Sequence, residues 1–175
     1  MKRLILWLPL ALFVLFLGVV AFRLGSGKDD TIRSHLVGKP MPEFALKPAL
    51  SGRPGLSAAD LRTGKPRLVN VFGSWCIPCA VESPQLLALK ARGIPIDAIA
   101  VRDRPEDVVR FLARHGDPFE RIGDDPRSQV QFALGSSGVP ETFIVDGKGV
   151  IRSQHMGEIR PEHVAGIAAA WEAAR

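Results

Sequence analysis

Apolar residues recur along this chain in two patterns that predict two kinds of element. Short apolar runs bounded by Gly, Pro or Asp predict strands, and apolar residues at every third or fourth position predict helices. Strands are expected at 43–46, 67–72, 96–101, 119–122, 142–145 and 150–155. Helices are expected at 57–62, 76–92, 105–115, 127–134 and 161–174. Strands and helices first alternate, and a hairpin and a closing helix then follow, which predicts an α/β fold with a mixed central sheet and helices on both faces.

Three details of this pattern can be compared with the structure. The helix at 105–115 is expected to bury Val108, Val109, Phe111 and Leu112. The segment 123–126, which ends in Asp-Pro, is expected to form a turn. Pro84 lies inside the helix at 76–92 and is expected to kink it.

The amino-terminal segment has a different pattern. Lys2 and Arg3 precede an uncharged, largely apolar run of 19 residues at 4–22, close to the ~20 that span a membrane as a helix. A cleaved secretory signal is the alternative, but its apolar core is shorter, about 7–15 residues. We therefore expect residues 1–22 to be an uncleaved anchor, 23–37 a flexible Gly-rich tether and 38–175 a single globular domain.

Charge gives the orientation and excludes one class of partner. Lys2 and Arg3 favour a cytoplasmic amino terminus, which places the domain outside, in the periplasm of a bacterial inner-membrane protein. The chain carries 23 basic and 18 acidic residues, a net charge of +5. Residues 1–37 account for +3, so the domain is nearly balanced. That balance gives no basic stripe, and we expect no nucleic-acid partner.

Both cysteines lie in the segment Cys76-Ile77-Pro78-Cys79, at the predicted joint between a strand and a helix. A thiolate at a helix start is stabilised by unpaired N–H groups, so Cys76 is the expected nucleophile and Cys79 the resolving thiol. A zinc site is the first alternative, but it needs about four ligands and the sequence has no second cysteine pair. A structural disulfide is the second, but so small a loop stabilises little.

These residues carry a resemblance. The segment 75–79, with Pro84 five residues after the second cysteine and Val139-Pro140 before a strand, resembles the thioredoxin family. Glu82, the segment 138–143 (Gly-Val-Pro-Glu-Thr-Phe) and the apolar amino terminus resemble one branch. That branch is the membrane-anchored thiol:disulfide interchange protein of cytochrome c biogenesis, the DsbE/CcmG type. The resemblance implies a thioredoxin-like fold preceded by one transmembrane helix.

The resemblance also implies an activity. The protein would be a protein-disulfide reductase that reduces the heme-binding cysteines of apocytochrome c, directly or through a thiol protein that presents them. It would receive electrons from a membrane thiol reductant of the DsbD/CcdA kind. Its redox-active group would be the Cys76–Cys79 disulfide, with no cofactor and no metal.

Further site residues follow from the resemblance. Pro140 is expected to be cis and, with Val139, to offer backbone to a substrate chain; an ordinary trans loop proline is the alternative. Glu82 and Glu141 are expected to lie near the sulfurs and manage protons. Their alternatives are a favourable charge near a helix start and an edge-strand surface residue. Trp75 is expected to pack beside Cys76, and a core aromatic is its alternative.

Asn70 stands where cytoplasmic thioredoxins carry a buried acid, which favours Glu82 and Glu141 for the proton role. Two other functions stay open. One is a general extracytoplasmic oxidoreductase for other exported proteins. The other is a non-catalytic chaperone that only binds apocytochrome.

Overall fold

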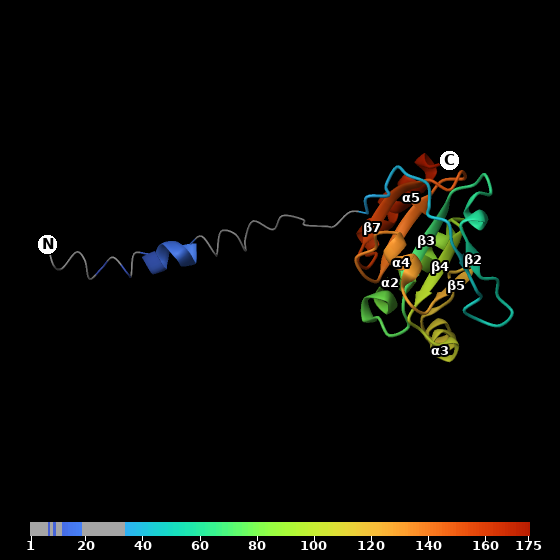
Figure 1. The fold of residues 1–175 in the computed structure, drawn as a ribbon, viewed down its shortest axis with the longest axis horizontal. Coiled ribbons are helices and arrows are strands. Elements are labelled where there is room, and N and C mark those ends of the chain that lie inside the picture. The colour runs from blue at the N-terminus through green and yellow to red at the C-terminus, as the bar shows by residue number, and fades with distance from the viewer. Residues whose placement is uncertain (1–6, 8, 10–11, 19–33) are drawn as a thin grey trace. The chain divides into compact units, whose positions relative to one another are not determined.

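The structure is a computed structural model of the 175-residue chain, and it describes residues 7, 9, 12–18 and 34–175 (Figure 1). The chain divides into two units, residues 1–32 and 33–175. No helix within the described residues has the length and apolar character needed to cross a membrane. Most of the predicted anchor at 1–22, and residues 23–33 of the tether predicted at 23–37, lie outside the described residues.

The second unit is organised around a five-stranded sheet in the order β5-β4-β3-β6-β7. Its parallel part consists of β3 (Arg67–Phe72), β4 (Ile96–Val101) and β5 (Ile122–Asp125). Its antiparallel part consists of β6 (Glu141–Val145), which pairs with β3, and β7 (Ile151–Met156). The central strands β3, β4 and β6 are buried on both faces, which explains why they are nearly continuous apolar runs.

Helices cover both faces of the sheet, but unequally. One face packs against α2 (Ile77–Ala91), α3 (Pro105–His115) and α5 (Val164–Ala173), the last preceded by the 3₁₀ turn η2 (Pro161–His163). The other face is covered by short elements: the hairpin of β1 (Ala45–Leu46) and β2 (Leu56–Ser57), the 3₁₀ turn η1 (Ala59–Leu61) and α4 (Gln129–Ala133). The predicted mixed sheet with helices is confirmed, and α2 continues through Pro84 without ending.

Two expected details are wrong. Val109 is exposed, because the buried stripe of α3 consists of Val108, Phe111 and Leu112 and position 109 turns away from it. The strand expected at 119–122 begins only at Ile122 and extends through residues 123–125 of the segment expected to form a turn, so that the turn begins at Pro126. Asp125 ends that strand because its carboxylate accepts the N–H groups of Gln129 and Gln131, which starts α4.

The folded unit also begins earlier than expected. Ser34, assigned to the tether by its polar surroundings, is buried. Its hydroxyl donates to the Leu134 carbonyl at 2.6 Å, and its N–H donates to the Gln154 side chain at 2.6 Å. Residues 34–37 therefore belong to the domain.

The topology brings three chain segments to one edge of the sheet. The parallel strands β3 and β4 both end there, and the antiparallel strand β6 begins there. The cysteine segment follows β3, and Val139-Pro140 precedes β6. This edge is where the candidate residues gather.

Candidate active site

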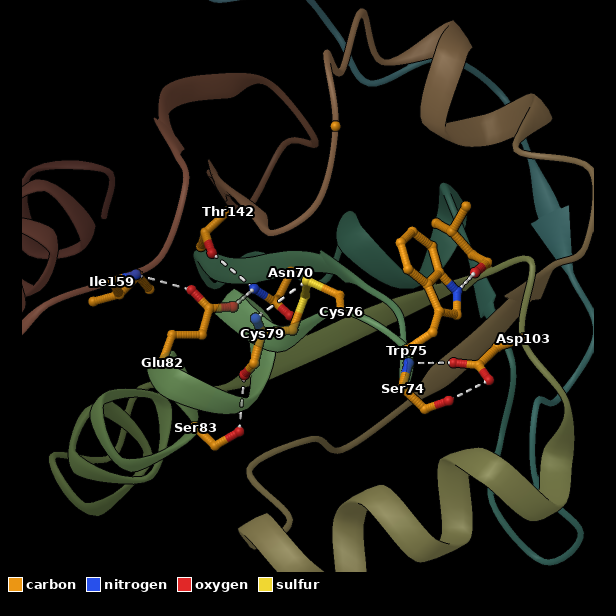
Figure 2. The surroundings of a disulfide bond; sticks show 12 residues. Asn70, Ser74, Trp75, Cys76, Cys79, Glu82, Ser83, Asp103, Thr142 and Ile159 are labelled. Carbon is orange, nitrogen blue, oxygen red and sulfur yellow. Dashed lines mark hydrogen bonds between the residues drawn. A yellow bond between two sulfur atoms is a disulfide. The ribbon is translucent and has the colours of Figure 1, made fainter.

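Cys76 is the residue that begins α2, and it forms a disulfide with Cys79 (Figure 2). Its backbone is extended, and its sulfur accepts the N–H of Cys79 at 3.2 Å in the position of a helix cap. This is the arrangement that stabilises a thiolate, since a free N–H and the positive end of the helix both face the sulfur. Cys76 is 5% exposed and Cys79 is 2% exposed, so an incoming thiol reaches Cys76 more readily.

The loop before Cys76 is held by the loop that follows β4. Asp103 accepts both the N–H of Ser74, at 2.5 Å, and its hydroxyl, at 2.6 Å. The Trp75 indole N–H donates to the Val101 carbonyl at 3.1 Å (Figure 2). Asp103 was not predicted from the sequence, although its position two residues after β4, a strand parallel to β3, was a usable signal because such strand ends meet at one edge.

Trp75 does not have the buried place that a core aromatic would have. Its side chain is 52% exposed, and the guanidinium of Arg102 lies 5.8 Å from the ring centroid. Its ring lies against Gly73, where an added Cβ would come within 2.6 Å of the indole. The ring therefore forms part of the rim around the disulfide. Ile77 and Val81, which flank Cys79 on the first turns of α2, are also exposed and apolar and are counted with this rim.

Glu82 lies one helical turn after Cys79 and is completely buried. One carboxylate oxygen accepts the Asn70 amide at 2.9 Å, and the other accepts the Ile159 N–H at 3.0 Å (Figure 2). Burial raises the pKa of Glu82 to about 7, against the effect of these two hydrogen bonds, which favour the carboxylate. A charge at the helix surface is thereby excluded for Glu82, and an acid that titrates near neutrality is suited to accept and return protons.

Asn70 connects this acid to the sheet. Its amide nitrogen donates to Glu82 and also to the Thr142 hydroxyl at 3.0 Å, while its own oxygen has no hydrogen-bond partner among the described residues. Asn70 and Thr142 are paired across β3 and β6, so both side chains point to the α2 face. The sequence analysis singled out Asn70, but it missed Thr142 and Ile159.

Pro140 and Glu141 approach the same edge from β6. The Val139–Pro140 peptide bond is cis, and Val139 packs against the core on both faces. Glu141 is buried, and one of its oxygens accepts the Gln154 amide at 2.8 Å. Burial raises the pKa of Glu141, with the polar groups of Ser136, Gln154 and Ser137 acting in the opposite direction.

Glu82 and Glu141, both expected near the sulfurs, lie on opposite faces of the sheet. Glu141 is paired with Val71, whereas its neighbour Thr142 is paired with Asn70. Successive strand residues point to opposite faces, so Glu141 points to the face covered by the β1–β2 hairpin and α4. It shares the sheet edge with the disulfide but lies on the other side of the sheet.

Within residues 7, 9, 12–18 and 34–175, no three His, Cys, Asp or Glu side chains come together as a metal site. The arrangement as a whole places a helix-capping sulfur, its more deeply buried disulfide partner and a buried acid that titrates near neutral pH at the start of one helix. That arrangement supports exchange of a disulfide with another thiol pair.

Comparison with known proteins also indicates thiol:disulfide interchange. Residues 37–154 match the AhpC/TSA family. The chain is 38% identical over 159 residues to thiol:disulfide interchange protein HelX of Rhodobacter capsulatus, covering 91% of this chain and 90% of that protein. It is 41% identical over 160 residues to thiol:disulfide interchange protein DsbE of Pseudomonas fluorescens, covering 91% and 88%.

A solved structure agrees with the fold. A crystal structure of a thioredoxin-family thiol:disulfide interchange protein from Chlorobium tepidum superposes with a TM-score of 0.61 at 25% identity, covering 77% of this chain and 94% of that one. The thioredoxin-like architecture expected from the cysteine segment is thereby confirmed.

Proposed function

Because the chain belongs to the DsbE and HelX thiol:disulfide interchange proteins within the AhpC/TSA family, we propose that it reduces the heme-binding cysteines of apocytochrome c. The chain is a thiol:disulfide oxidoreductase by family and by its cysteine pair. The substrate, the direction of electron flow and the cellular place belong to the proposal. Reduction proceeds directly or through a thiol protein that presents the apocytochrome.

One observation carries the proposal: the sulfur of Cys76 caps α2, and the buried acid Glu82 lies one turn behind Cys79. In the reduced protein the Cys76 thiolate attacks the client disulfide, forms a mixed disulfide and releases the first client sulfur as a thiolate. Glu82 takes the proton of Cys79, whose thiolate then attacks Cys76 and releases the second client sulfur. The client gains two electrons, and its two thiolates take up two protons, one passed on from Cys79 by Glu82 and one from water, while the protein is left with the Cys76–Cys79 disulfide.

The surroundings of the sulfurs suit a polypeptide client. The rim side chains Trp75, Ile77 and Val81 are exposed and apolar, which favours contact with an unfolded chain. Val139 precedes the cis proline at the same edge, and in the proposal its backbone pairs with an extended segment of the client. This is the expected form of an apocytochrome segment around its C-x-x-C-H motif.

The proposal includes a location. Residues 1–22 anchor the protein in the bacterial inner membrane with the amino terminus in the cytoplasm and the domain in the periplasm. The support is the uncharged run at 4–22 behind Lys2 and Arg3. In that oxidising compartment the disulfide is reduced again by a membrane thiol donor of the DsbD/CcdA kind.

Trapping with the Cys79→Ser variant tests the substrate. Without its resolving thiol, Cys76 stays bound to the client as a mixed disulfide that survives denaturation and can be identified by mass spectrometry. Apocytochrome c, or a thiol protein dedicated to it, is the expected partner. The matched control is Cys76→Ser/Cys79→Ser, which should trap nothing. A broad set of exported proteins would favour the general oxidoreductase, and normal holocytochrome c in the double variant would favour the non-catalytic chaperone.

A redox titration against glutathione tests the direction. A reductase must hold its disulfide more firmly than the strong oxidants of the periplasm, whose potential is about −120 mV. The expected midpoint is clearly below that value. A midpoint at or above it would contradict reduction and leave the interchange activity in place.

A further inference from the structure

The loop Gly157–Arg160, between β7 and η2, contacts two parts of the active site. The N–H of Gly157 donates to the Pro140 carbonyl at 3.0 Å. Two residues later, the N–H of Ile159 donates to the Glu82 carboxylate at 3.0 Å, and the Ile159 side chain is fully buried. The loop therefore joins the cis proline to the buried acid, although it lies 77 residues from Glu82 in the chain.

Two histidines hold this loop from its two ends. His155, on β7, lies 3.3 Å from the Glu158 carbonyl through its Nε2. His163, the last residue of η2, accepts the Arg160 N–H at its Nδ1, at 3.1 Å. The rings lie 4.6 Å apart between centroids. The two side chains thus bond the residues immediately before and after Ile159.

The chemistry of these bonds defines the state of each ring. A carbonyl only accepts, so His155 carries a hydrogen on Nε2. His163 accepts at Nδ1, so that nitrogen carries no hydrogen. The ion pair between Arg160 and Glu158 fixes the loop conformation less, because it is exposed to solvent and exposed ion pairs contribute little stability.

We propose that His163 and His155 are positioning residues that hold the Gly157–Arg160 loop so that the Ile159 N–H meets the Glu82 carboxylate. They touch neither sulfur and act only through Ile159. The inference depends on the proton role of Glu82 proposed above. It extends that role, since the strength of the hydrogen bond from the Ile159 N–H then adjusts how firmly Glu82 holds its proton.

The test is a carboxyl ¹³C titration of Glu82 in the oxidised full-length protein, where neither cysteine titrates; Glu82→Gln identifies the signal. His163→Ala removes the acceptor for Arg160 and frees the loop. Its expected effect is a rise in the Glu82 pKa of about one unit, because a hydrogen bond to the charged form is weakened. Hydrogen exchange at the Ile159 amide should become faster in the same variant.

Two further variants separate positioning from simple helix capping. Gln is a usual partner at the third helical position of a capping box, so His163→Gln should restore both the Glu82 pKa and the protection of the Ile159 amide. His155→Ala should act in the same direction as His163→Ala. His35→Ala, at an exposed histidine, is the matched control and should leave the Glu82 pKa unchanged.

The inference is overturned if His163→Ala lowers thermal stability while the Glu82 pKa and Ile159 exchange stay as in the wild type. It is also overturned if His163→Gln shifts the Glu82 pKa as far as His163→Ala does. No client or electron donor is present in the titration. Failure of the apocytochrome proposal therefore leaves this result unaffected, and failure here leaves the trapping result unaffected.

Discussion

Glu82 and Glu141 are two buried carboxylates at the same edge of one sheet, and the difference between them lies in the face on which each is found. Burial raises the pKa of both. Glu82 lies on α2, the helix that also carries Cys79, and points at the sheet face on which α2 packs, whereas Glu141 lies on β6 and points to the face covered by the β1–β2 hairpin and α4. A raised pKa therefore does not mark a proton-transfer residue by itself; position relative to the sulfurs decides.

The largest expected effect is on stability. The pKa of Glu82 is about 7 when folded, against 4.5 for an ordinary Glu, so the folded state holds this proton more tightly. The resulting stabilisation is complete below pH 4.5 and is lost as the pH rises through 7. Gln does not titrate. The unfolding free energy of Glu82→Gln minus that of the wild type should therefore increase by about 3 kcal/mol as the pH rises from 4.5 to 8. Urea unfolding of the oxidised protein at pH 4.5 and pH 8 measures it, and equal differences at both pH values would contradict it.

Next in size is the rate of exchange. Glu82→Gln keeps the side-chain volume and an acceptor for Ile159, but it removes the group that gives Cys79 its proton when the disulfide opens. Reduction of the disulfide by dithiothreitol at pH 7 should slow about 100-fold, a typical general-acid contribution. Stopped-flow tryptophan fluorescence can follow the reaction. An unchanged rate would remove Glu82 from the mechanism.

A third experiment alters the hydrogen-bond partner of each acid. Asn70→Asp replaces the amide donor of Glu82 with a second carboxyl group, and one proton should then be held by the pair to higher pH. In the pH profile of the rate of disulfide reduction by dithiothreitol, the fall in rate at high pH should shift to a pH about one unit higher. Gln154→Glu makes the same change beside Glu141 and should leave the profile in place. A shift with Gln154→Glu would place Glu141 in the reaction.

The smallest effect is expected for Glu141→Gln. Gln retains an acceptor for the Gln154 amide, and position 141 points away from the sulfurs. The dithiothreitol rate should change by about threefold or less, under 1 kcal/mol of activation free energy. A loss comparable to that of Glu82→Gln would mean that the two faces communicate, and the contrast drawn here would fail.

The parts of the site that were predictable from sequence are those that depend on neighbours in the chain. The strand before Cys76 and the helix after it both follow from local apolar patterns, and so does the capping position of the sulfur. Glu82 was recognisable through the family resemblance, which rests on its place three residues after Cys79. The strand predicted at 119–122 exists, but it is shifted along the chain to Ile122–Asp125.

The remaining parts depend on contacts between distant segments. Ile159 lies 77 residues from Glu82 in the chain and contacts it through its backbone N–H. Every residue except proline has such a group, so no pattern of side chains could have predicted this contact. The face of Glu141 depends on the register between β3 and β6, and a slip of one residue would reverse it. Asp103 is the intermediate case, since strand order would have indicated it.

The sulfur of Cys76 is both the cap of a helix and the atom that changes partners. Every turnover therefore acts on the first turn of α2, and the folding of that turn and the chemistry draw on the same lone pairs. When a client is bonded to Cys76, the same sulfur has less electron density to offer the N–H of Cys79. The strength of this capping hydrogen bond, and with it the order of the first turn of α2, therefore changes with each step of the oxidation cycle.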